Sequence, residues 1–261
     1  MQLKNARILL TGATGGLGRA LAEQLAAGGA ALLLTGRDAG RLASVAANAS
    51  SEIVRFPARL DDPAELVALA AAARKFGVNA LINNAGVGSF GLFAEQSWTE
   101  IEQALRTNLE IPMRLTHALL PDLLVQPAAS IVNIGSTFGS LPFPGFAAYS
   151  SAKAGLRGFS QALRRELADS SVTVLHFAPR AIATPFNSAA VDALNHQLGN
   201  HSDAPETVAR RIVEAFEQGG GECHFGFPER LFAWINGFLP GVIDRALAGK
   251  LSTIMRHAAA R

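Results

Sequence analysis

Short apolar runs alternate with longer amphipathic segments through the first 190 residues of the chain. Six apolar runs predict strands at residues 7–12, 30–36, 52–58, 80–86, 130–136 and 172–179. A continuous run, rather than an alternating one, is typical of a strand covered on both faces. Ala-, Leu- and Glu-rich segments of helical period lie between them, as at 17–28, 62–75 and 97–123. This alternation predicts an α/β fold: a doubly wound parallel sheet with helices on both faces.

The pattern becomes less regular after the sixth predicted strand. Residues 187–204 give no clear strand or helix signal, and we expect them to form a substrate loop over the ligand-binding end of the sheet. Residues 205–218 predict a helix that begins at Pro205, and 222–227 predict a seventh strand. No linker or repeat divides the chain, so we expect one domain over residues 1–261, with 222–261 as a C-terminal extension.

Composition narrows the class of protein. With 49% hydrophobic residues and a net charge of +2, the chain can bury a large core and differs from disordered proteins. It has no long run of Lys or Arg, so we expect no nucleic-acid partner. A single cysteine, Cys223, and no signal-peptide pattern predict a cytoplasmic protein. The six histidines show no metal-ligand spacing, so we expect no metal site.

A glycine-rich turn, TGATGGLG at residues 11–18, follows the first predicted strand and opens a predicted helix. Gly12 permits a tight turn, and Gly16 and Gly18 let the backbone approach a diphosphate. The start of the following helix offers free N–H groups and the positive end of its dipole. The turn therefore predicts a dinucleotide site in a Rossmann-type fold.

The end of the second strand, LLLTGRD, bears on the choice of nucleotide. NAD-binding chains commonly carry an acidic residue there, which holds the ribose diol. Here Gly36 occupies that position and Arg37 follows it. A guanidinium can clamp a 2′-phosphate with two parallel hydrogen bonds, so we expect NADP(H) to be favoured over NAD(H). Asp38 and a surface role for Arg37 keep NAD open.

The only tyrosine of the chain, Tyr149, lies four residues before Lys153. In a helix these residues share one face. An ammonium beside a phenol is expected to lower the phenol pKa from about 10, which makes the pair a plausible general acid/base. Ser136, at the end of the fifth strand, is predicted at the same edge of the sheet and can hydrogen-bond a reacting oxygen.

Taken together, these pieces resemble a short-chain dehydrogenase/reductase of the single-domain type. They follow the order and spacing of that family over about residues 1–185, including thirteen residues from Ser136 to Tyr149. The matching pieces are TGATGGLG (11–18), NNAG (83–86), TNLEIP (107–112), IVNIGS (131–136), YSSAK (149–153) and APRAIATP (178–185).

The resemblance implies roles for four residues. Tyr149 would be the catalytic acid/base, and Lys153 would lower its pKa and bind the nicotinamide ribose. Ser136 would orient the substrate carbonyl, and Asn108 would anchor a water of a proton relay. The implied cofactor contacts are Gly12, Thr14, Gly16, Leu17, Gly18, Arg37, Leu60, Asn84, Ala85, Gly86, Tyr149, Lys153, Pro179, Ile182 and Thr184.

The chain departs from the family pattern at two arginines and in its tail. Arg59 stands where an aspartate commonly binds the adenine amino group, so either Asp61 and Asp62 substitute for it or the adenine relies on backbone contacts. Arg180 replaces a glycine beside the nicotinamide, and it either turns outward or lines the substrate site. The aromatic tail at 222–261 is expected to form a substrate lid, pack against a second subunit, or rest on a membrane surface.

These features predict an NADPH-dependent carbonyl reductase or secondary alcohol dehydrogenase. An NAD-linked dehydrogenase and a nucleotide-binding sensor or partner-binding protein without catalysis are the alternatives. Family members are commonly homodimers or homotetramers, and we expect one of these. Six phenylalanines in the expected substrate segments predict a hydrophobic ketone or aldehyde, and they are Phe90, Phe93, Phe138, Phe143, Phe146 and Phe186.

Overall fold

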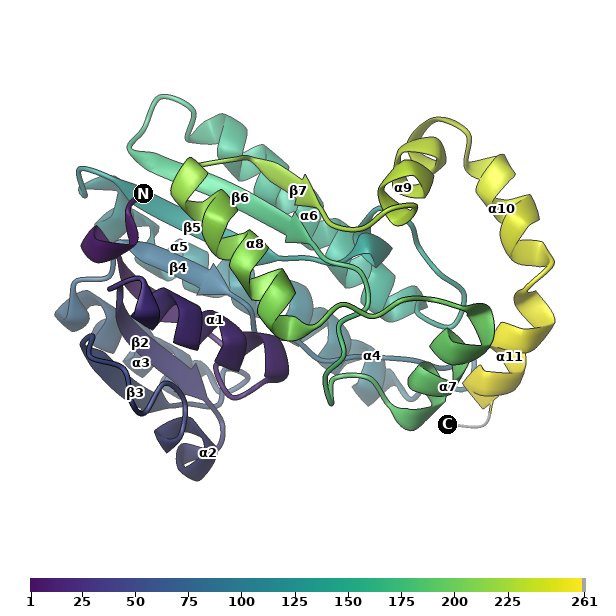
Figure 1. Ribbon diagram of the computed structural model, residues 1–261, viewed down its shortest axis with the longest axis horizontal. Helices are drawn as coiled ribbons and strands as arrows, with labels where there is room; N and C mark the ends of the chain where they lie inside the picture. Colours follow the sequence, from purple (N-terminus) through teal and green to yellow (C-terminus); the bar gives the residue numbers. More distant parts are fainter. Residues whose placement is uncertain (260–261) are drawn as a thin grey trace.

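The computed structural model of the protein describes residues 1–259, and seven parallel strands form its central sheet (Figure 1). The strand order across the sheet is β3-β2-β1-β4-β5-β6-β7, which confirms the expected fold class. The order reverses between β1 and β4, and ligands bind sheets of this kind at the carboxyl ends of the strands beside such a reversal. The strands are β1 (Arg7–Leu10), β2 (Ala31–Gly36), β3 (Ile53–Pro57), β4 (Ala80–Asn83), β5 (Ala129–Ile134), β6 (Val172–Ala178) and β7 (Glu222–His224).

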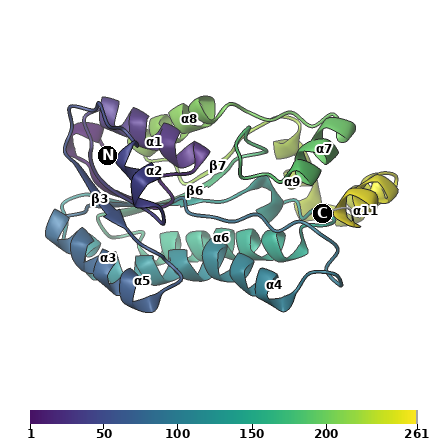
Figure 2. The same ribbon diagram turned by 90° about the horizontal axis from the view of Figure 1, so that it is seen from below.

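Helices cover both faces of this sheet (Figure 2). On one face lie α1 (Gly16–Ala27) and α8 (Pro205–Gln218), and on the other α3 (Pro63–Phe76), α5 (Ile111–Leu124) and α6 (Ala147–Glu166). Leu32 and Leu34 of β2 join the core under α1, whereas Leu33 joins the core on the opposite side. Because both faces are buried, the strands appear in the sequence as continuous apolar runs.

The structure confirms the predicted helices, except that the one predicted at 97–123 is divided into three elements. The segment at 97–123 forms α4 (Trp98–Leu105), a π-helical turn η2 (Arg106–Glu110) and then α5. Ser97 begins α4 with a capping box in which its hydroxyl accepts from the N–H of Glu100. Three shorter elements were not predicted: the 3-10 turn η1 (Leu3–Asn5), α2 (Ala39–Ala43) and the 3-10 turn η3 (Thr137–Gly139).

The expected substrate loop at 187–204 contains a helix, so that expectation was wrong in part. Helix α7 (Ala189–Leu198) begins after Ser188, whose hydroxyl accepts from the N–H of Val191. It ends at Gly199, which has φ of +67°. The Ser cap and the Gly stop were the signals in the sequence that locate this helix.

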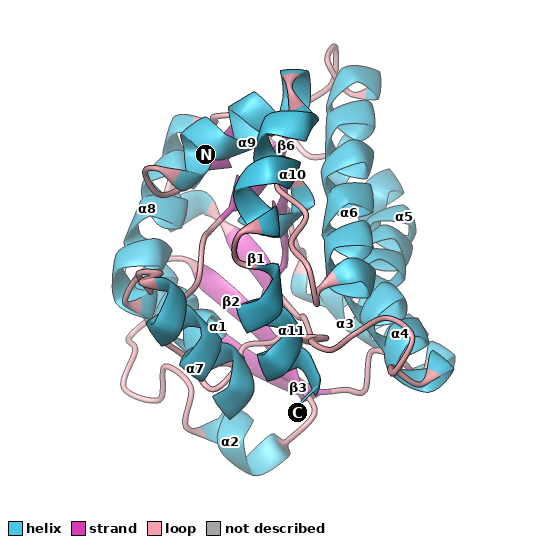
Figure 3. Cartoon of the chain, turned by 90° about the vertical axis from the view of Figure 1, so that its right-hand side faces the viewer, coloured by secondary structure: helices cyan, strands magenta, loops and turns pink. Residues whose placement is uncertain are grey.

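The C-terminal extension forms the short β7 and then three helices, α9 (Glu229–Phe238), α10 (Pro240–Ala248) and α11 (Leu251–Ala259). They form an arm along one side of the molecule, and α11 returns to lie beside α7 (Figures 1 and 3). No residue of α9 is buried, and Trp234 and Phe238 are among its exposed aromatic side chains. Within residues 1–259, no helix combines the length and apolar character needed to cross a bilayer.

Candidate active site

The loop between β1 and α1 leaves room only for glycine at three positions. Gly12 has φ of +64°, and a Cβ there would lie 2.8 Å from the Cα of Ala85. A Cβ at Gly18 would collide with the carbonyl oxygen of Gly12, and one at Gly16 with the side chain of Thr184. Helix α1 starts within this loop, so its first N–H groups face the carboxyl edge of the sheet. The result is a cradle whose shape and polarity fit the diphosphate of a dinucleotide.

Asn84 and Ala85, which follow β4, hold this loop in place. The Nδ2 of Asn84 donates to the carbonyl oxygens of Thr11, at 2.9 Å, and Gly12, at 3.2 Å. The Oγ1 of Thr11 accepts from the backbone N–H groups of Asn84 and Ala85, both at 3.0 Å. These bonds join the ends of β1 and β4 at the reversal in strand order.

Two guanidinium groups lie at the edge of the cradle, after β2. Gly36 approaches Thr14 so closely that a Cβ would lie 3.0 Å from its Cγ2. Arg37 is exposed, with no hydrogen bond or ion pair to another residue of 1–259. Arg41, which the sequence analysis did not single out, donates to the carbonyl oxygen of Thr14 at 3.1 Å. Its position in α2, four residues after Arg37, was the signal available.

Neither aspartate near Arg59 is free of other contacts. Arg59 forms an ion pair with Asp61 at 3.3 Å, and the hydrogen bond from Arg59 lowers the pKa of Asp61. The carboxylate of Asp62 accepts from the N–H of Ala64 at 2.8 Å and caps α3. Leu60, between Arg59 and Asp61, is partly buried and packs against the core. In each of these aspartates one carboxylate oxygen is engaged within the protein: Oδ2 of Asp61 and Oδ1 of Asp62.

The other predicted cofactor residues lie around the same edge. Leu17 and Ile182 are partly buried against the core under the cradle. The carbonyl oxygen of Pro179 accepts from the N–H of Thr137 at 2.9 Å, which ties the segment after β6 to the segment after β5. Thr184 packs on Gly16, as described above.

Ser136 and Tyr149 meet at the carboxyl edge of β5. Ser136 follows β5, and Tyr149 lies in the first turn of α6. Burial raises the pKa of Tyr149 to about 12, and the Ser136 hydrogen bond opposes this only in part. The net shift is therefore upward, and the lowering of this pKa by Lys153 stays a prediction. The Nζ of Lys153 lies 5.8 Å from the ring centroid of Tyr149, and desolvation dominates.

The Nζ of Lys153 and the Oδ1 of Asn108 both lie close to Gly86. The buried Nζ of Lys153 donates to the carbonyl oxygen of Ile134 at 2.8 Å, and burial lowers the pKa of Lys153 to about 8. A Cβ at Gly86 would lie 2.9 Å from the Oδ1 of Asn108 and 3.9 Å from the Nζ of Lys153. Only a residue without a side chain fits between these two groups.

Asn108 is placed by the π-helical turn η2. Its Nδ2 donates to the carbonyl oxygens of Val87 and Ala104, both at 2.9 Å, and its Oδ1 accepts from the N–H of Val87 at 3.3 Å. The side chain is fully buried. Single π-helical turns inside α-helices occur frequently at functional sites, because the extra residue redirects one side chain.

Aromatic rings enclose the phenol of Tyr149. The ring centroids of Phe138, Phe146 and Phe186 lie 6.5, 6.3 and 6.2 Å from that of Tyr149. Phe90 and Phe143 extend this group, since their centroids lie 4.7 Å and 5.3 Å from those of Phe146 and Phe138. Phe93, predicted for the same pocket, is 58% exposed and lies outside the cluster.

Helices α7 and α11 complete this aromatic cluster. Val191 and Leu194 of α7 and Ile254 and Ala258 of α11 are buried in the same cluster as Tyr149. The last helix of the extension therefore packs against the aromatic cluster around Tyr149.

Arg180 does not line this cluster. Its guanidinium forms two hydrogen bonds with the carboxylate of Asp203, at 2.7 and 3.0 Å, and lies 3.5 Å from Glu229. The Asp203 partner raises the pKa of Arg180. The side chain of Arg180 is only 19% exposed, and it joins the segment before α8 to the start of α9.

Comparison with known proteins agrees with this geometry. Residues 6–195 match the sequence profile of the short chain dehydrogenase family. The chain is 34% identical over 186 residues to the 3-oxoacyl-(acyl-carrier-protein) reductase FabG of Escherichia coli (strain K12), covering 70% of this chain and 76% of that protein.

Two solved structures share the fold over nearly the whole chain. One is a short-chain dehydrogenase from Sphingobium yanoikuyae in complex with NADPH, with a TM-score of 0.78, 27% identity and coverage of 92% of this chain and 95% of that one. The other is a short-chain dehydrogenase/reductase from Burkholderia phymatum in complex with NAD, with a TM-score of 0.81, 25% identity and coverage of 91% and 94%.

Proposed function

The chain belongs to the short-chain dehydrogenase/reductase family of oxidoreductases, and on that premise we propose that it is an NADPH-dependent carbonyl reductase or secondary alcohol dehydrogenase. The proposed substrate is a hydrophobic ketone or aldehyde. One observation carries the proposal: Ser136, Tyr149 and Lys153 gather beside the glycine cradle, at the carboxyl edge of the sheet.

NADPH, when bound, supplies hydride to the carbonyl carbon. Ser136 donates a hydrogen bond to the carbonyl oxygen and orients it. Tyr149 gives its phenolic proton to the same oxygen as negative charge develops there. Because burial holds the pKa of Tyr149 at about 12, the phenol is protonated at neutral pH, which is the form that a general acid requires.

Lys153 restores the proton of Tyr149 after each reduction. With a pKa of about 8 its amine is mostly protonated at neutral pH, yet it releases a proton far more readily than an exposed lysine. Lys153 and Tyr149 would hold the nicotinamide ribose. Asn108, 2.9 Å from the Cβ position of Gly86, would anchor a relay water next to them.

The cradle residues Gly12, Gly16 and Gly18 would hold the cofactor diphosphate, and Ile182 and Thr184 the nicotinamide half. Arg37 would clamp the 2′-phosphate, because it is exposed at the cradle edge and Gly36 leaves space before it. Arg41 adds a second positive charge at this edge. We therefore favour NADP(H) over NAD(H).

The aromatic cluster around Tyr149 supports an apolar substrate. Rings and aliphatic side chains from η3, α6, α7 and α11 surround the phenol. They offer apolar contact to an acyl, aromatic or alicyclic ketone and few partners for sugar hydroxyls. Since FabG is named a 3-oxoacyl reductase, a 3-oxoacyl thioester belongs in the test panel beside simple aryl ketones.

A titration of the purified protein with NADPH and with NADH, followed by nicotinamide fluorescence, tests the cofactor proposal. We expect tighter binding of NADPH, and Arg37→Asp is expected to weaken NADPH by at least tenfold through the lost charge-assisted bonds. Arg211→Asp, which also reverses an exposed arginine but lies in α8 outside the predicted cofactor residues, is the matched control. Equal binding of both cofactors would favour the NAD-linked dehydrogenase, and binding of neither would favour a protein without this chemistry.

We propose that the enzyme is a homodimer or homotetramer. The exposed apolar side chains of α9 and α10 are the surface available for a second subunit, and peripheral contact with a membrane through the same arm is the second candidate. The exposed apolar side chains of this arm include Leu231, Phe232, Trp234, Phe238, Leu239 and Val242. Mass photometry of the chain and of a Trp234→Ser, Phe238→Ser variant, together with liposome flotation, distinguishes the two.

A further inference from the structure

A row of polar side chains crosses the sheet beneath α5 and α6. Asn83 of β4 pairs in register with Asn133 of β5, Asn133 with His176 of β6, and His176 with Glu222 of β7. In-register neighbours of parallel strands point to the same face. Two residues earlier on the same strands, the row Leu81, Ile131 and Val174 is entirely apolar and buried. The polar row therefore interrupts a hydrophobic layer.

His176 is the member of this row that the protein leaves unpartnered. Asn83 donates to Asn133 at 2.8 Å, and Asn133 donates to Ser160 of α6 at 2.9 Å. His176 has no exposed surface, and neither ring nitrogen has a hydrogen-bond partner within residues 1–259. A buried polar ring without partners costs stability, so its retention calls for a purpose or for bound water.

The ring of His176 lies directly behind the catalytic segment. A Cβ at Gly135 would collide with its Nε2, so a glycine at 135 is what admits the imidazole. The residue before Gly135, Ile134, accepts the hydrogen bond of Lys153, and the residue after it is Ser136. Burial lowers the pKa of His176 to about 4, and the positive charge of Lys153 contributes to this lowering.

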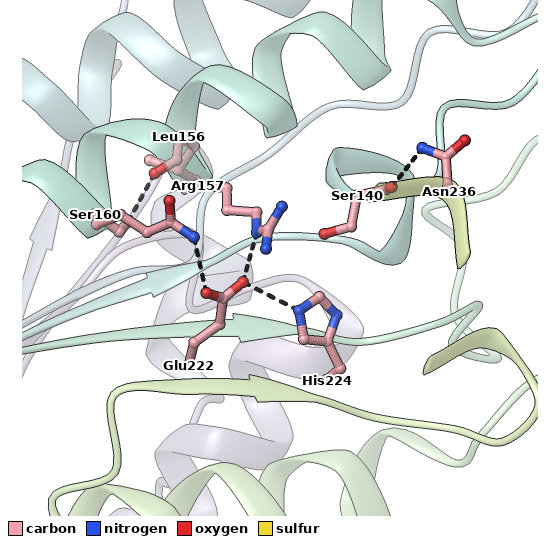
Figure 4. Close-up of polar contacts among 8 residues, drawn as sticks. Ser140, Leu156, Arg157, Ser160, Glu222, His224 and Asn236 are labelled. Atoms are coloured by element: carbon pink, nitrogen blue, oxygen red, sulfur yellow. Dashed lines mark hydrogen bonds and ion pairs between the residues drawn. The ribbon is translucent and has the colours of Figure 1, made fainter. Parts of the chain in front are cut away.

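The outer end of the row reaches solvent at the edge strand β7. Glu222 accepts from Arg157 at 2.5 Å and from Gln161 at 2.9 Å, and it lies 3.0 Å from the Nε2 of His224 (Figure 4). The side chains of Glu222 and His224 are each 18% exposed, and that of Arg157 is 35% exposed. Glu222 opposes the lowering of the His176 pKa, and Arg157 and His224 act in the same direction as Lys153.

We propose that His176 relays protons to Lys153 from solvent at the sheet edge lined by Glu222 and His224, and so supplies a route separate from the one at Asn108. This inference rests on the proposed function. Tyr149 loses its O–H proton to the substrate oxygen, and Lys153 loses an N–H proton to the phenolate. A ring N–H of His176 gives its proton, through water, to the Lys153 amine. The opposite ring nitrogen takes one from solvent water at the β7 edge, and the imidazole stays neutral overall. Glu222 remains a carboxylate there, because burial, which raises its pKa, is outweighed by the hydrogen bonds of Arg157 and Gln161, and its pKa is lowered to about 2.

The first test needs no substrate. The ring ¹⁵N signals of His176, assigned by their loss in His176→Gln, are followed for exchange of the N–H with solvent at pH 7. We expect the ring N–H to exchange much faster than the backbone N–H groups of Leu175 and Phe177, which are equally buried in the same strand. A ring N–H protected as strongly as those amides would show a sealed site and overturn the relay.

The second test separates proton delivery from hydride transfer. NADPH oxidation at 340 nm and proton uptake by a pH indicator are followed together in multiple-turnover stopped flow with an accepted ketone. His176→Gln is expected to leave the first turnover within about twofold of the wild-type rate, since Tyr149 begins protonated. Later turnovers and proton uptake should slow by about tenfold or more.

His117→Gln, on the exposed surface of α5, is the matched control, and His176→Phe is a second variant should the first not fold. An unchanged proton-uptake rate in a folded His176 variant would contradict the proposal. Equal slowing of the first and later turnovers would mean a structural effect on the site and would also contradict it. Absence of turnover in the wild-type protein would instead contradict the proposed function, and the exchange measurement would still decide on the relay.

Discussion

Tyr149 and Lys153 are both buried, and burial favours the neutral form of each side chain. The pKa of the phenol rises to about 12 and that of the ammonium falls to about 8. At neutral pH the phenol is thus held protonated, while the amine beside it releases its proton readily. This arrangement suits the protonation of a carbonyl oxygen better than the abstraction of a proton from an alcohol.

The Lys153 pKa predicts how reduction depends on pH. We expect kcat to be level below about pH 8 and to fall as the pH rises through 8, because the ammonium that reprotonates Tyr149 is lost. A pH profile of kcat between 6 and 10 measures this. A profile that stays level to pH 10 would mean that Lys153 does not titrate in this range, contrary to the account.

Lys153 also makes the unfolding free energy of the protein depend on pH, and the direction of this dependence can be measured separately. Its pKa is lower in the folded state than in the unfolded chain, so the unfolded chain binds more protons between about pH 8 and 10.5. Unfolding free energy attributable to this residue therefore rises with pH across that window. Lys153→Met is expected to be more stable than the wild type at pH 7, by denaturant midpoint, while losing activity.

At the scale of elements, Gly12, between β1 and α1, and Gly158, within α6, are expected to respond in opposite ways to replacement by alanine. Gly12→Ala forces a side chain into φ of +64° and to 2.8 Å from the Cα of Ala85. We expect a loss of more than about 1 kcal/mol in unfolding free energy and weaker NADPH binding. Thermal melting and the fluorescence titration measure these effects.

Gly158→Ala is the control for this change. Gly158 lies within α6, and a Cβ there meets nothing within 4 Å. The same substitution should therefore stabilise the protein by about 0.5–1 kcal/mol, through higher helix propensity. Similar effects at the two positions would contradict the steric account of the loop.

The elements that the sequence predicts well are those with a local cause. Apolar runs gave six strands, and helical period gave α1, α3 and α8, because burial on one or both faces fixes each pattern. The π-helical turn at Asn108 was not foreseen, since it depends on bonds from the Asn108 amide to Val87, 21 residues earlier. The raised pKa of Tyr149 was missed for a related reason: spacing shows the lysine but not the burial.

At the scale of the whole molecule, the C-terminal arm is the part that the sequence left open. Its composition was compatible with a lid, a subunit contact and a membrane contact, and it favoured the first of these. The structure resolves one part of this, because Ile254 of α11 is buried in the cluster that contains Tyr149. The rest of the arm is joined to the sheet through Arg180, Asp203 and Glu229, and through a hydrogen bond from Asn236 to Ser140 (Figure 4).

Ile254→Ala tests whether α11 shapes the substrate site. Loss of a fully buried side chain should cost about 2–5 kcal/mol of stability and loosen the cover over Tyr149. We expect KM for apolar ketones to rise severalfold, while the Kd for NADPH stays unchanged. Met255→Ala, at the next position but 42% exposed, is the control and should change neither quantity. Equal KM values for both variants would place the substrate away from α11.

The central claim is that Tyr149 protonates a carbonyl substrate at this site, and Tyr149→Phe tests it most directly. The measurement is NADPH oxidation at 340 nm with a panel of hydrophobic ketones and aldehydes, alongside the Kd for NADPH. We expect kcat to fall by about 10² to 10⁴ while the Kd changes little, because the ring and its packing remain. Reduction at the wild-type rate by Tyr149→Phe with bound NADPH would contradict the account.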